Sequence, residues 1–544
     1  MKKCTLNLLM DTTVCFFYFL GLKRNMAFIS NKVISDQDLK NFHEILSHLY
    51  GPNSDHIVIK NKTITSSIEL YQSLSPKNDV INLMIGYLRQ QLVLYKDGGL
   101  SVGLLATSII RNFGEFDAPL AEIMEMNSFV VEWFMGNIQR FSYQCNIGRL
   151  KNVIKLIRTI LLSKLTLTKE ECKQLCLLFA RAFTIENPWQ DCHVINIEKS
   201  EILESALLEG LLLRLDRYST IQQGLSNANV LLFSVSISLD SEEILGDSKL
   251  DIEVESMRHF KSNLMNKTIL RLCKEVVSLV GVVICQKVIH PHAKKYFKDH
   301  NVVCIDRVGG SFTPLLERVC NCVRVPSLTE KNLSGFVGNI RSAEKKEIGG
   351  DSYLQLGSEK MKTMLLCGKD DVIVDALKHC YEQSLIALKT VSSNDLVVNG
   401  GGCLETQLAI CLLQELSSSK YVRIYVTSLL KLSQAVCKRP SLNHKVDSRY
   451  YHHWIEDSLK CCCGMFMKTS EMEFVGFLEL IKSNSSLDSL NEFKHQVRSS
   501  ILENEPAGVL LHSQTIFSHN FASSVQLATM VLRIGATIVH KTSS

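Results

Sequence analysis

The sequence predicts an α+β protein of several domains. Its 544 residues are more than one hydrophobic core usually organises. Apolar residues recur at helical spacing over about residues 36–184, whereas strand-like runs alternate with helix-like runs over about residues 197–350. Together these observations favour a mostly helical region followed along the chain by an α/β module.

The first region reads as a series of helices. Apolar residues three or four positions apart place one face of each segment against a core. The residues that carry this pattern are Leu39, Phe42, Ile45 and Leu46, then Leu83, Ile85, Leu88, Leu92 and Val93, then Leu156, Ile157, Ile160 and Leu161. We therefore expect helices over most of residues 36–165 and again over residues 151–184.

The middle of the chain has the character of strands. The run Val230–Leu239 alternates apolar and polar residues in its second half, and Val280–Cys285 and Val302–Ile305 are rich in β-branched residues. The last two each follow a helix-like stretch, which predicts an α/β module. We expect Gly349 and Gly350 to mark its end.

Two glycine turns suggest a phosphate-binding backbone. Gly400, Gly401 and Gly402 separate the apolar run Asp395–Val398 from a helix-like stretch, and Asp97-Gly98-Gly99 forms a second turn. Glycine allows positive φ, so that backbone N–H groups can point at an anion beside a helix N-terminus. The structural alternative, which the residues alone favour, is that these glycines serve only as tight turns.

Composition excludes some classes of partner. Lys plus Arg number 60 and Asp plus Glu 55, and a net charge of +5 is too small to indicate a nucleic-acid or anionic-membrane surface. The 19 cysteines are scattered through apolar segments, as free buried thiols are in a reducing compartment. Cysteine usage therefore favours the cytosol.

No metal site is expected. Cys461–Cys463 and the pair Cys320 and Cys322 lack a second cysteine pair at zinc-finger spacing. His290-Pro291-His292 and His452-His453 are more typical of surface or core residues than of ligands.

The N-terminus carries an apolar run after Lys2-Lys3. Asp11 interrupts the run, the uninterrupted part is too short to cross a bilayer, and no cleavage site of small residues follows it. We interpret residues 1–25 as an N-terminal extension. A secreted or membrane-tethered protein is an alternative that rests on this run alone.

Several motifs together resemble the group II chaperonins, the family of the thermosome and the cytosolic t-complex ring. In family order the chain carries Tyr50-Gly51-Pro52, Thr63–Ser67, Lys96–Ser101, Cys285–Pro291 and Gly400–Glu405. The details of Cys285–Pro291, Ile305–Gly309 and Cys463-Gly464 resemble a divergent branch, the McKusick-Kaufman/Bardet-Biedl chaperonin-like proteins. The resemblance extends over about residues 27–544.

The resemblance implies three kinds of domain. These would be a mostly helical equatorial domain, a small intermediate hinge domain and an α/β apical domain. Their expected ranges are 26–150 and 396–544 (equatorial), 151–200 and 349–395 (intermediate), and 201–348 (apical). In the family, the region that corresponds to Glu242–Asn263 forms a helical lid. Here it shows no clear lid pattern, so the sequence does not decide whether a lid is present.

The resemblance also implies an ATP site that has lost most of its chemistry. Lys96 replaces the first glycine of the phosphate loop, Gly99 and Leu100 replace two threonines, and Ser66 and Ser67 replace Asn-Asp. The aspartate that family members bring in on closure aligns with Ala387, so no catalytic residue is expected. The residues left for a vestigial nucleotide site are Gly51, Pro52, Asp97, Gly98, Gly99, Gly401, Gly402 and Glu405. ATP with Mg²⁺ stays an open alternative as a cofactor.

The implied function is assembly of a multiprotein complex rather than ATP-driven folding. By resemblance the clients would be subunits of the Bardet-Biedl ciliary complex, and the partners other chaperonin-like proteins and cytosolic chaperonin ring subunits. No nucleic acid and no membrane insertion are expected, and the location would be the cytoplasm, at the centrosome or basal body. The alternative is an ATP-dependent chaperone of the t-complex type.

The C-terminal landmark of the family bears on ring formation. Leu532–Ala536 corresponds to a strand that pairs with a neighbouring subunit in the family, and it lacks both acids found there. This loss argues against membership of a standard ring.

Overall fold

A computed structural model divides the chain into two compact units. Unit 1 comprises residues 1–166 and 379–544, and unit 2 comprises residues 167–378. The structure describes residues 27–30, 35–51, 56–114, 119–165, 167–215, 224–238, 267, 269–328, 330, 332–416, 419, 421–437, 510–534 and 537–540. The division falls within one long helix, α12 (Asp371–Asn394).

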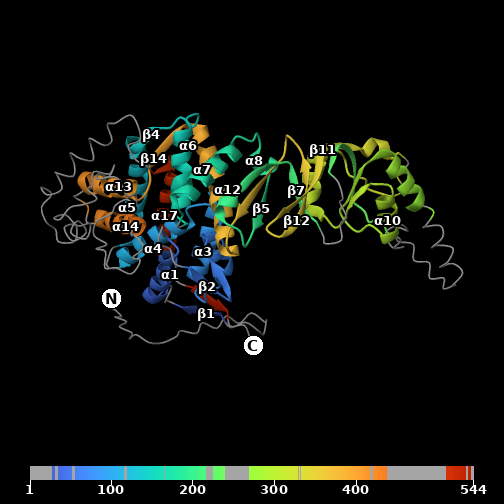
Figure 1. The fold of residues 1–544 in the computed structure, drawn as a ribbon. Helices are drawn as coiled ribbons and strands as arrows, with labels where there is room; N and C mark the ends of the chain where they lie inside the picture. The colour runs from blue at the N-terminus through green and yellow to red at the C-terminus, as the bar shows by residue number, and fades with distance from the viewer. Residues whose placement is uncertain are drawn as a thin grey trace, which may run out of the picture. The chain divides into compact units, whose positions relative to one another are not determined.

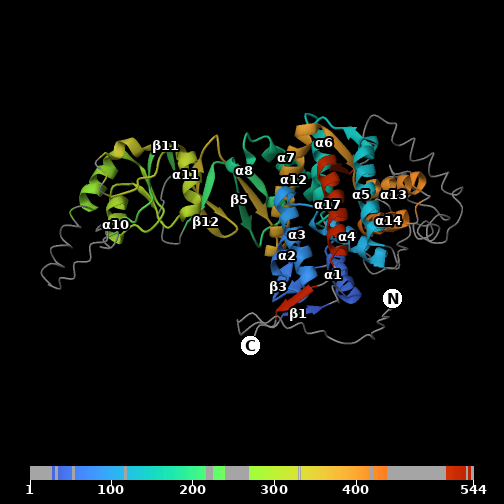
Figure 2. The same cartoon turned by 180° about the vertical axis from the view of Figure 1, so that it is seen from behind.

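Unit 1 is mostly helical (Figure 1). Its helices are α1 (Asp36–His48), α2 (Ser67–Ser73), α3 (Asp79–Tyr95), α4 (Gly99–Gly114), α5 (Leu120–Asn137), the 3-10 turn η1 (Ile138–Phe141), α6 (Leu150–Leu162), the end of α12, α13 (Cys403–Glu415), α14 (Val422–Cys437) and α17 (Gln514–Leu532). Helix α4 packs against α1, α3, α14 and α17, and Figure 2 shows α4 and α17 side by side. Because α4 is apolar on nearly every side, it forms the centre of this core.

Helices predicted from apolar periodicity are present as α1, α3 and α6, but in α3 the prediction that Leu83 and Val93 face the core is wrong, because both are exposed. In α1 the buried residues are Leu39, Phe42 and Leu46, which share one face. Capping side chains fix where α1 and α3 begin. At α1 the Ser35 side chain accepts from the Asp38 N–H, and at α3 the Asn78 side chain accepts from the N–H groups of Val80 and Ile81.

Three small sheets complete unit 1. Strand β1 (Ala27–Ser30) pairs with β16 (Thr537–His540), and β2 (Ile57–Ile59) pairs with β3 (Lys62–Ile64). Strand β14 (Leu396–Asn399) lies between β4 (Ser142–Gln144) and β15 (Leu511–Ser513). The expected strand at 532–536 is wrong in its bounds, because Leu532 ends helix α17 and the strand begins at Thr537 and pairs within the chain.

Unit 2 is built on a six-stranded sheet. Its order is β10 (Val303–Ile305), β9 (Val282–Cys285), β8 (Leu225–Phe233), β11 (Gly338–Ile348), β12 (Asp351–Gly357) and β7 (Leu211–Arg214). Strands β8, β9 and β10 are parallel to one another, and the remaining pairs are antiparallel. The strands expected around residues 230, 282 and 303 are therefore present, within the α+β class that the sequence predicts.

Both faces of this sheet are covered. Along β8, Val230 and Leu232 face one apolar cluster, whereas Leu231 and Phe233 face another. Helix α11 (Thr313–Cys320), which follows the 3-10 turn η3 (Gly310–Phe312), packs into the first cluster. Helix α10 (Pro291–Asp299) and a helical stretch at residues 269–279 pack into the second.

A second, three-stranded sheet belongs to the same unit. Strand β13 (Lys362–Cys367) lies between β5 (Cys192–Ile197) and β6 (Ala206–Glu209). Near it lie α7 (Lys169–Phe183), the short α8 (Pro188–Asp191) and the 3-10 turn η2 (Ile202–Glu204); a further turn, η4 (Leu333–Phe336), precedes β11. Gly349 and Gly350 form the turn between β11 and β12, so the large sheet continues past them.

Several features named from the sequence lie outside the described residues. They are the N-terminal extension 1–25, Pro52, the lid region Glu242–Asn263, His452-His453, Cys461–Cys463 and Gly535-Ala536.

Candidate functional site

A cavity of about 140 Å³ in unit 1 opens at the turn between α3 and α4. Its walls come from that turn, from the residues after α1, and from α6, α12, α13, α14 and α17. The lining residues that bear on the predicted site are Gly51, Ser67, Asp97, Gly98, Gly99, Leu100, Lys164, Gln383 and Glu405. Segments more than four hundred residues apart in the chain thus meet at one point.

The structure brings together most of the residues predicted for a nucleotide site. Gly51, Asp97, Gly98, Gly99 and Glu405 all line this cavity. Gly401 and Gly402 do not line it, and Pro52 lies outside the described residues.

Gly401 and Gly402 form the turn before α13 instead. Gly402 has a φ of 86°, and a Cβ there would lie 2.7 Å from the Ser433 hydroxyl. The Ser433 hydroxyl donates to the Gly402 carbonyl at 2.8 Å. Because the chain itself packs this closely around Gly402, the turn requires glycine whether or not a ligand binds nearby.

Ala387, the residue that the family resemblance aligns with the catalytic aspartate, is buried on α12. It lies four residues after Gln383, one turn further along the same helix face. A methyl group at this position can neither hold a metal ion nor orient a water molecule.

Lys96 holds the turn between α3 and α4 against α12. Its backbone is left-handed, with a φ of 55°, where the family resemblance places a glycine. Its ammonium group lies 3.2 Å from a Glu382 carboxylate oxygen, and its carbonyl accepts from the Gln383 amide at 2.6 Å. Lys164, two residues after the end of α6, donates to the Gln383 side-chain oxygen at 2.8 Å. The α3–α4 turn, α12 and the segment that follows α6 are thus tied together by side chains of the protein itself.

Gly98 makes the closest approach in the cavity. Its φ is 82°, and a Cβ at this position would lie 2.2–2.4 Å from the Asn520 side chain of α17. Gln91 holds that side chain by donating to its oxygen at 3.1 Å. The space beside Gly98 is therefore already filled by the protein.

Burial shifts the pKa of His512, which lines the cavity, and of Cys380, which lies on α12 and does not line it. Burial lowers the pKa of His512, against an opposing effect of the Asp97 carboxylate. Burial also raises the pKa of the Cys380 thiol to about 11, which the Lys164 ammonium partly offsets. Both groups are therefore neutral near pH 7, and the other acidic and basic side chains that line the cavity are Asp97, Lys164 and Glu405.

The cavity as it stands does not fit a nucleotide. Ligand pockets usually have volumes of about 300–1,000 Å³, and this one has about 140 Å³. Much of the lining is apolar, with Leu429, Leu432, Ile516, Phe517 and Phe521 among its residues. Two carboxylates, on Asp97 and Glu405, remain as possible contacts for Mg²⁺, which normally also needs phosphate oxygens and water.

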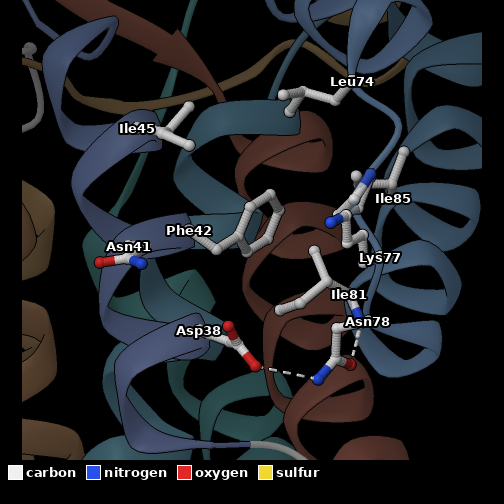
Figure 3. Close-up of a pocket in the computed structure, with 10 residues that line it drawn as sticks. Asp38, Asn41, Phe42, Ile45, Leu74, Lys77, Asn78, Ile81 and Ile85 are labelled. Atoms are coloured by element: carbon white, nitrogen blue, oxygen red, sulfur yellow. Dashed lines mark hydrogen bonds between the residues drawn. The ribbon is translucent and has the colours of Figure 1, made fainter.

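A second cavity, of about 370 Å³, lies in a groove between α1 and α3 (Figure 3). Its floor includes Phe42, Ile81 and Ile85, and at its rim the Asn78 amide donates to the Asp38 carboxylate at 3.2 Å. The apolar periodicity of α1 predicts a buried face, but it does not indicate that a groove lies beside Phe42.

Other kinds of site find little support in the described part of the chain. Over those residues no three His, Cys, Asp or Glu side chains gather closely enough to hold a metal ion. Within the same ranges no helix combines the length and apolar character needed to cross a bilayer. The cysteines whose pairing can be judged there are free thiols.

Comparison with known proteins decides the family. The model of the TCP-1/cpn60 chaperonin family matches residues 43–542, which is most of the chain. The chain belongs to the TCP-1/cpn60 chaperonin family. A chaperonin-family role follows, and the resemblance seen in the motifs is confirmed.

Individual relatives agree with the divergent branch named from the sequence. Proteins called Molecular chaperone MKKS are 23% identical in Mus musculus and 22% identical in Homo sapiens, each over 79% of this chain and 84% of the relative. Thermosome subunit alpha of Aeropyrum pernix is 25% identical over 40% of this chain and 41% of its own length.

Proposed function

We propose that this chaperonin-family protein is an assembly factor that holds partners without turning over ATP. The observation that carries the proposal is the cavity at Asp97 and Gly98, which has a volume of only about 140 Å³. The contacts of Lys96 with Glu382 and Gln383 already close the turn against α12, a contact that needs no nucleotide. A scaffold of this kind works because it binds the partly assembled client more tightly than the client's other states.

The proposal extends to clients and location. Its clients would be subunits of the Bardet-Biedl ciliary complex, and its partners other chaperonin-like proteins and cytosolic chaperonin ring subunits. It would act in the cytoplasm, at the centrosome or basal body. Similarity to relatives named Molecular chaperone MKKS supports this extension.

Titration with ATP and Mg²⁺ tests the absence of turnover. We expect no hydrolysis above background, and less than about 1 kcal/mol of stabilisation by millimolar nucleotide, since a ligand at 100 times its Kd would give about 2.7 kcal/mol. Asp97→Ala should behave as the unsubstituted protein does. Hydrolysis that Asp97→Ala abolishes would contradict the proposal.

That contrary outcome defines the second candidate, an ATP-dependent chaperone of the t-complex type. The observation in its favour is that Asp97, Gly98 and Glu405 still line one cavity. It requires the Lys96 contacts to open so that a nucleotide can enter.

Mass measurement of complexes recovered from cells tests the scaffold role. We expect to recover the protein in complexes that contain client subunits and that differ in mass from one another. Recovery only in closed rings of chaperonin subunits would favour the second candidate instead.

A further inference from the structure

Two cysteines lie together where α11 ends in unit 2. Cys320 is the last residue of α11 and is buried, whereas Cys322 is partly exposed. Asn321 between them has a left-handed backbone with a φ of 49°, and the Cys322 N–H donates to the Glu317 carbonyl at 3.1 Å. The two thiols share a hydrogen bond.

Strand β11 supports this turn from behind. A Cβ on Gly338 would lie 2.2 Å from the Cys320 carbonyl oxygen and 2.5 Å from the Cys322 Cβ. The backbone of β11 therefore touches both cysteines directly. This contact limits how far the backbone turn that carries the two cysteines can move away from β11.

The two thiols differ in reactivity. The hydrogen bond raises the pKa of Cys320, together with burial, and lowers the pKa of Cys322, against burial and the nearby Glu317 carboxylate. By contrast, burial raises the pKa of Cys285 and Cys367 to about 11. The thiolate is the nucleophile in exchange, so Cys322 is the attacking sulfur of the pair.

We propose that Cys320 and Cys322 form a dithiol site that exchanges with disulfides from solution, of which glutathione disulfide is the simplest. Two residues span at most about 7 Å between Cα atoms, and the left-handed turn shortens that span. Disulfides need a separation of about 4.4–6.8 Å. An internal Cys320–Cys322 bond is therefore within reach.

The reaction proceeds in two exchanges. The Cys322 thiolate attacks one sulfur of glutathione disulfide, forms a mixed disulfide and releases one glutathione thiolate. The Cys320 thiol then loses its proton to solvent and attacks the Cys322 sulfur, which releases the second glutathione thiolate. The cysteine pair is oxidised by two electrons, and glutathione disulfide is reduced to two thiols after each thiolate takes up a proton.

Tryptic peptides of the full-length native protein test the exchange. Cleavage after Arg318 and Arg324 yields peptide 319–324, which holds both cysteines and no other, and peptide 275–287 holds Cys285 alone as an internal control. After treatment with glutathione disulfide, we expect peptide 319–324 to lose two hydrogens and to retain no glutathione. In the reduced protein near pH 7.5, iodoacetamide should label Cys322 at least about a hundredfold faster than Cys285.

Variants separate the two roles. Cys320→Ala should retain glutathione on Cys322, and Cys322→Ser should leave peptide 319–324 unmodified, with circular dichroism confirming that each variant is folded. Equal labelling rates for Cys322 and Cys285 in the unsubstituted protein would overturn the proposal, whatever the variants do. So would a peptide 319–324 that keeps all its hydrogens at every ratio of oxidised to reduced glutathione.

Discussion

Two residues in the turn between α3 and α4 have left-handed backbones for different reasons. Gly98 needs to lack a Cβ because the Asn520 side chain occupies that space. Lys96 carries a full side chain in a conformation that costs about 1–2 kcal/mol for residues other than glycine. Its contacts with Glu382 and Gln383 offset part of that cost.

A matched pair of glycine substitutions tests this reading. Gly98→Ala should destabilise the protein by about 2 kcal/mol or more, because it combines backbone strain with a clash against Asn520. Gly86→Ala, inside α3 and with nothing within 4 Å of the new Cβ, should stabilise it by about 0.5–1 kcal/mol. Urea unfolding measures both, and equal effects of the two substitutions would refute the role given to Asn520.

The sequence revealed only part of the candidate site. Asp97, Gly98 and Glu405 stand in motifs, so their proximity could be expected from the family resemblance. Asn520 and His512 lie in a segment without a motif, hundreds of residues from the turn that they contact, and no local pattern indicates such pairing. Whether these residues ever hold a nucleotide stays a prediction.

Among the elements, α12 has the clearest role in closing the cavity. The Gln383 amide donates to the Lys96 carbonyl and its oxygen accepts from Lys164, so one side chain joins α12, the segment after α6 and the α3–α4 turn. A side chain with two such hydrogen bonds restrains the turn more than a surface ion pair does, because one of them satisfies a backbone carbonyl.

Replacing that side chain should loosen the turn. Gln383→Leu keeps the size but leaves the Lys96 carbonyl and the Lys164 ammonium without this partner, at a cost of about 1–3 kcal/mol. Amide hydrogen exchange at residues 96–102 should become faster. Gln37→Leu, on the exposed face of α1, serves as the control and should change stability by less than about 0.5 kcal/mol. Unchanged exchange in Gln383→Leu would show that the turn does not depend on α12.

Element types were more predictable than element ends. The strand expected at Val230–Leu239 is observed at Leu225–Phe233. It starts earlier because Leu225–Val230 pairs with β11, and it ends earlier because the Ser234 N–H turns to the Val325 carbonyl. Pairing with distant partners, rather than local composition, sets these ends.

At the scale of the whole molecule, both units hold histidines in the neutral form. Burial lowers the pKa of His43 to about 4 and also lowers the pKa of His193 and His512. Near His43, the charges of Arg111 and Lys431 act in the same direction and Glu44 opposes them. The His43 ring lies 2.7 Å from the Thr107 hydroxyl.

These histidines predict a loss of stability in mild acid. Between about pH 6.5 and pH 4 the unfolded chain binds protons that folded His43 does not, so its contribution decreases as the pH falls, by up to about 3 kcal/mol. His43→Gln should remove that part of the pH dependence, whereas exposed His48→Gln should not. Urea unfolding at a series of pH values measures the difference, and parallel curves for the two variants would contradict the prediction.

The order of the two units along the chain has a consequence for synthesis. Helix α4 is apolar on nearly every side, yet its partners α14 and α17 are encoded after all of unit 2. Roughly 400 residues separate α4 from α17, and at about 5–20 residues per second a ribosome needs about 20–80 s to make them. Until α17 is made, α4 can pack only against the part of its core that comes earlier, such as α1 and α3, and the face that α17 covers stays exposed. A protein of the chaperonin family would thus itself benefit from a holding chaperone while it is being made.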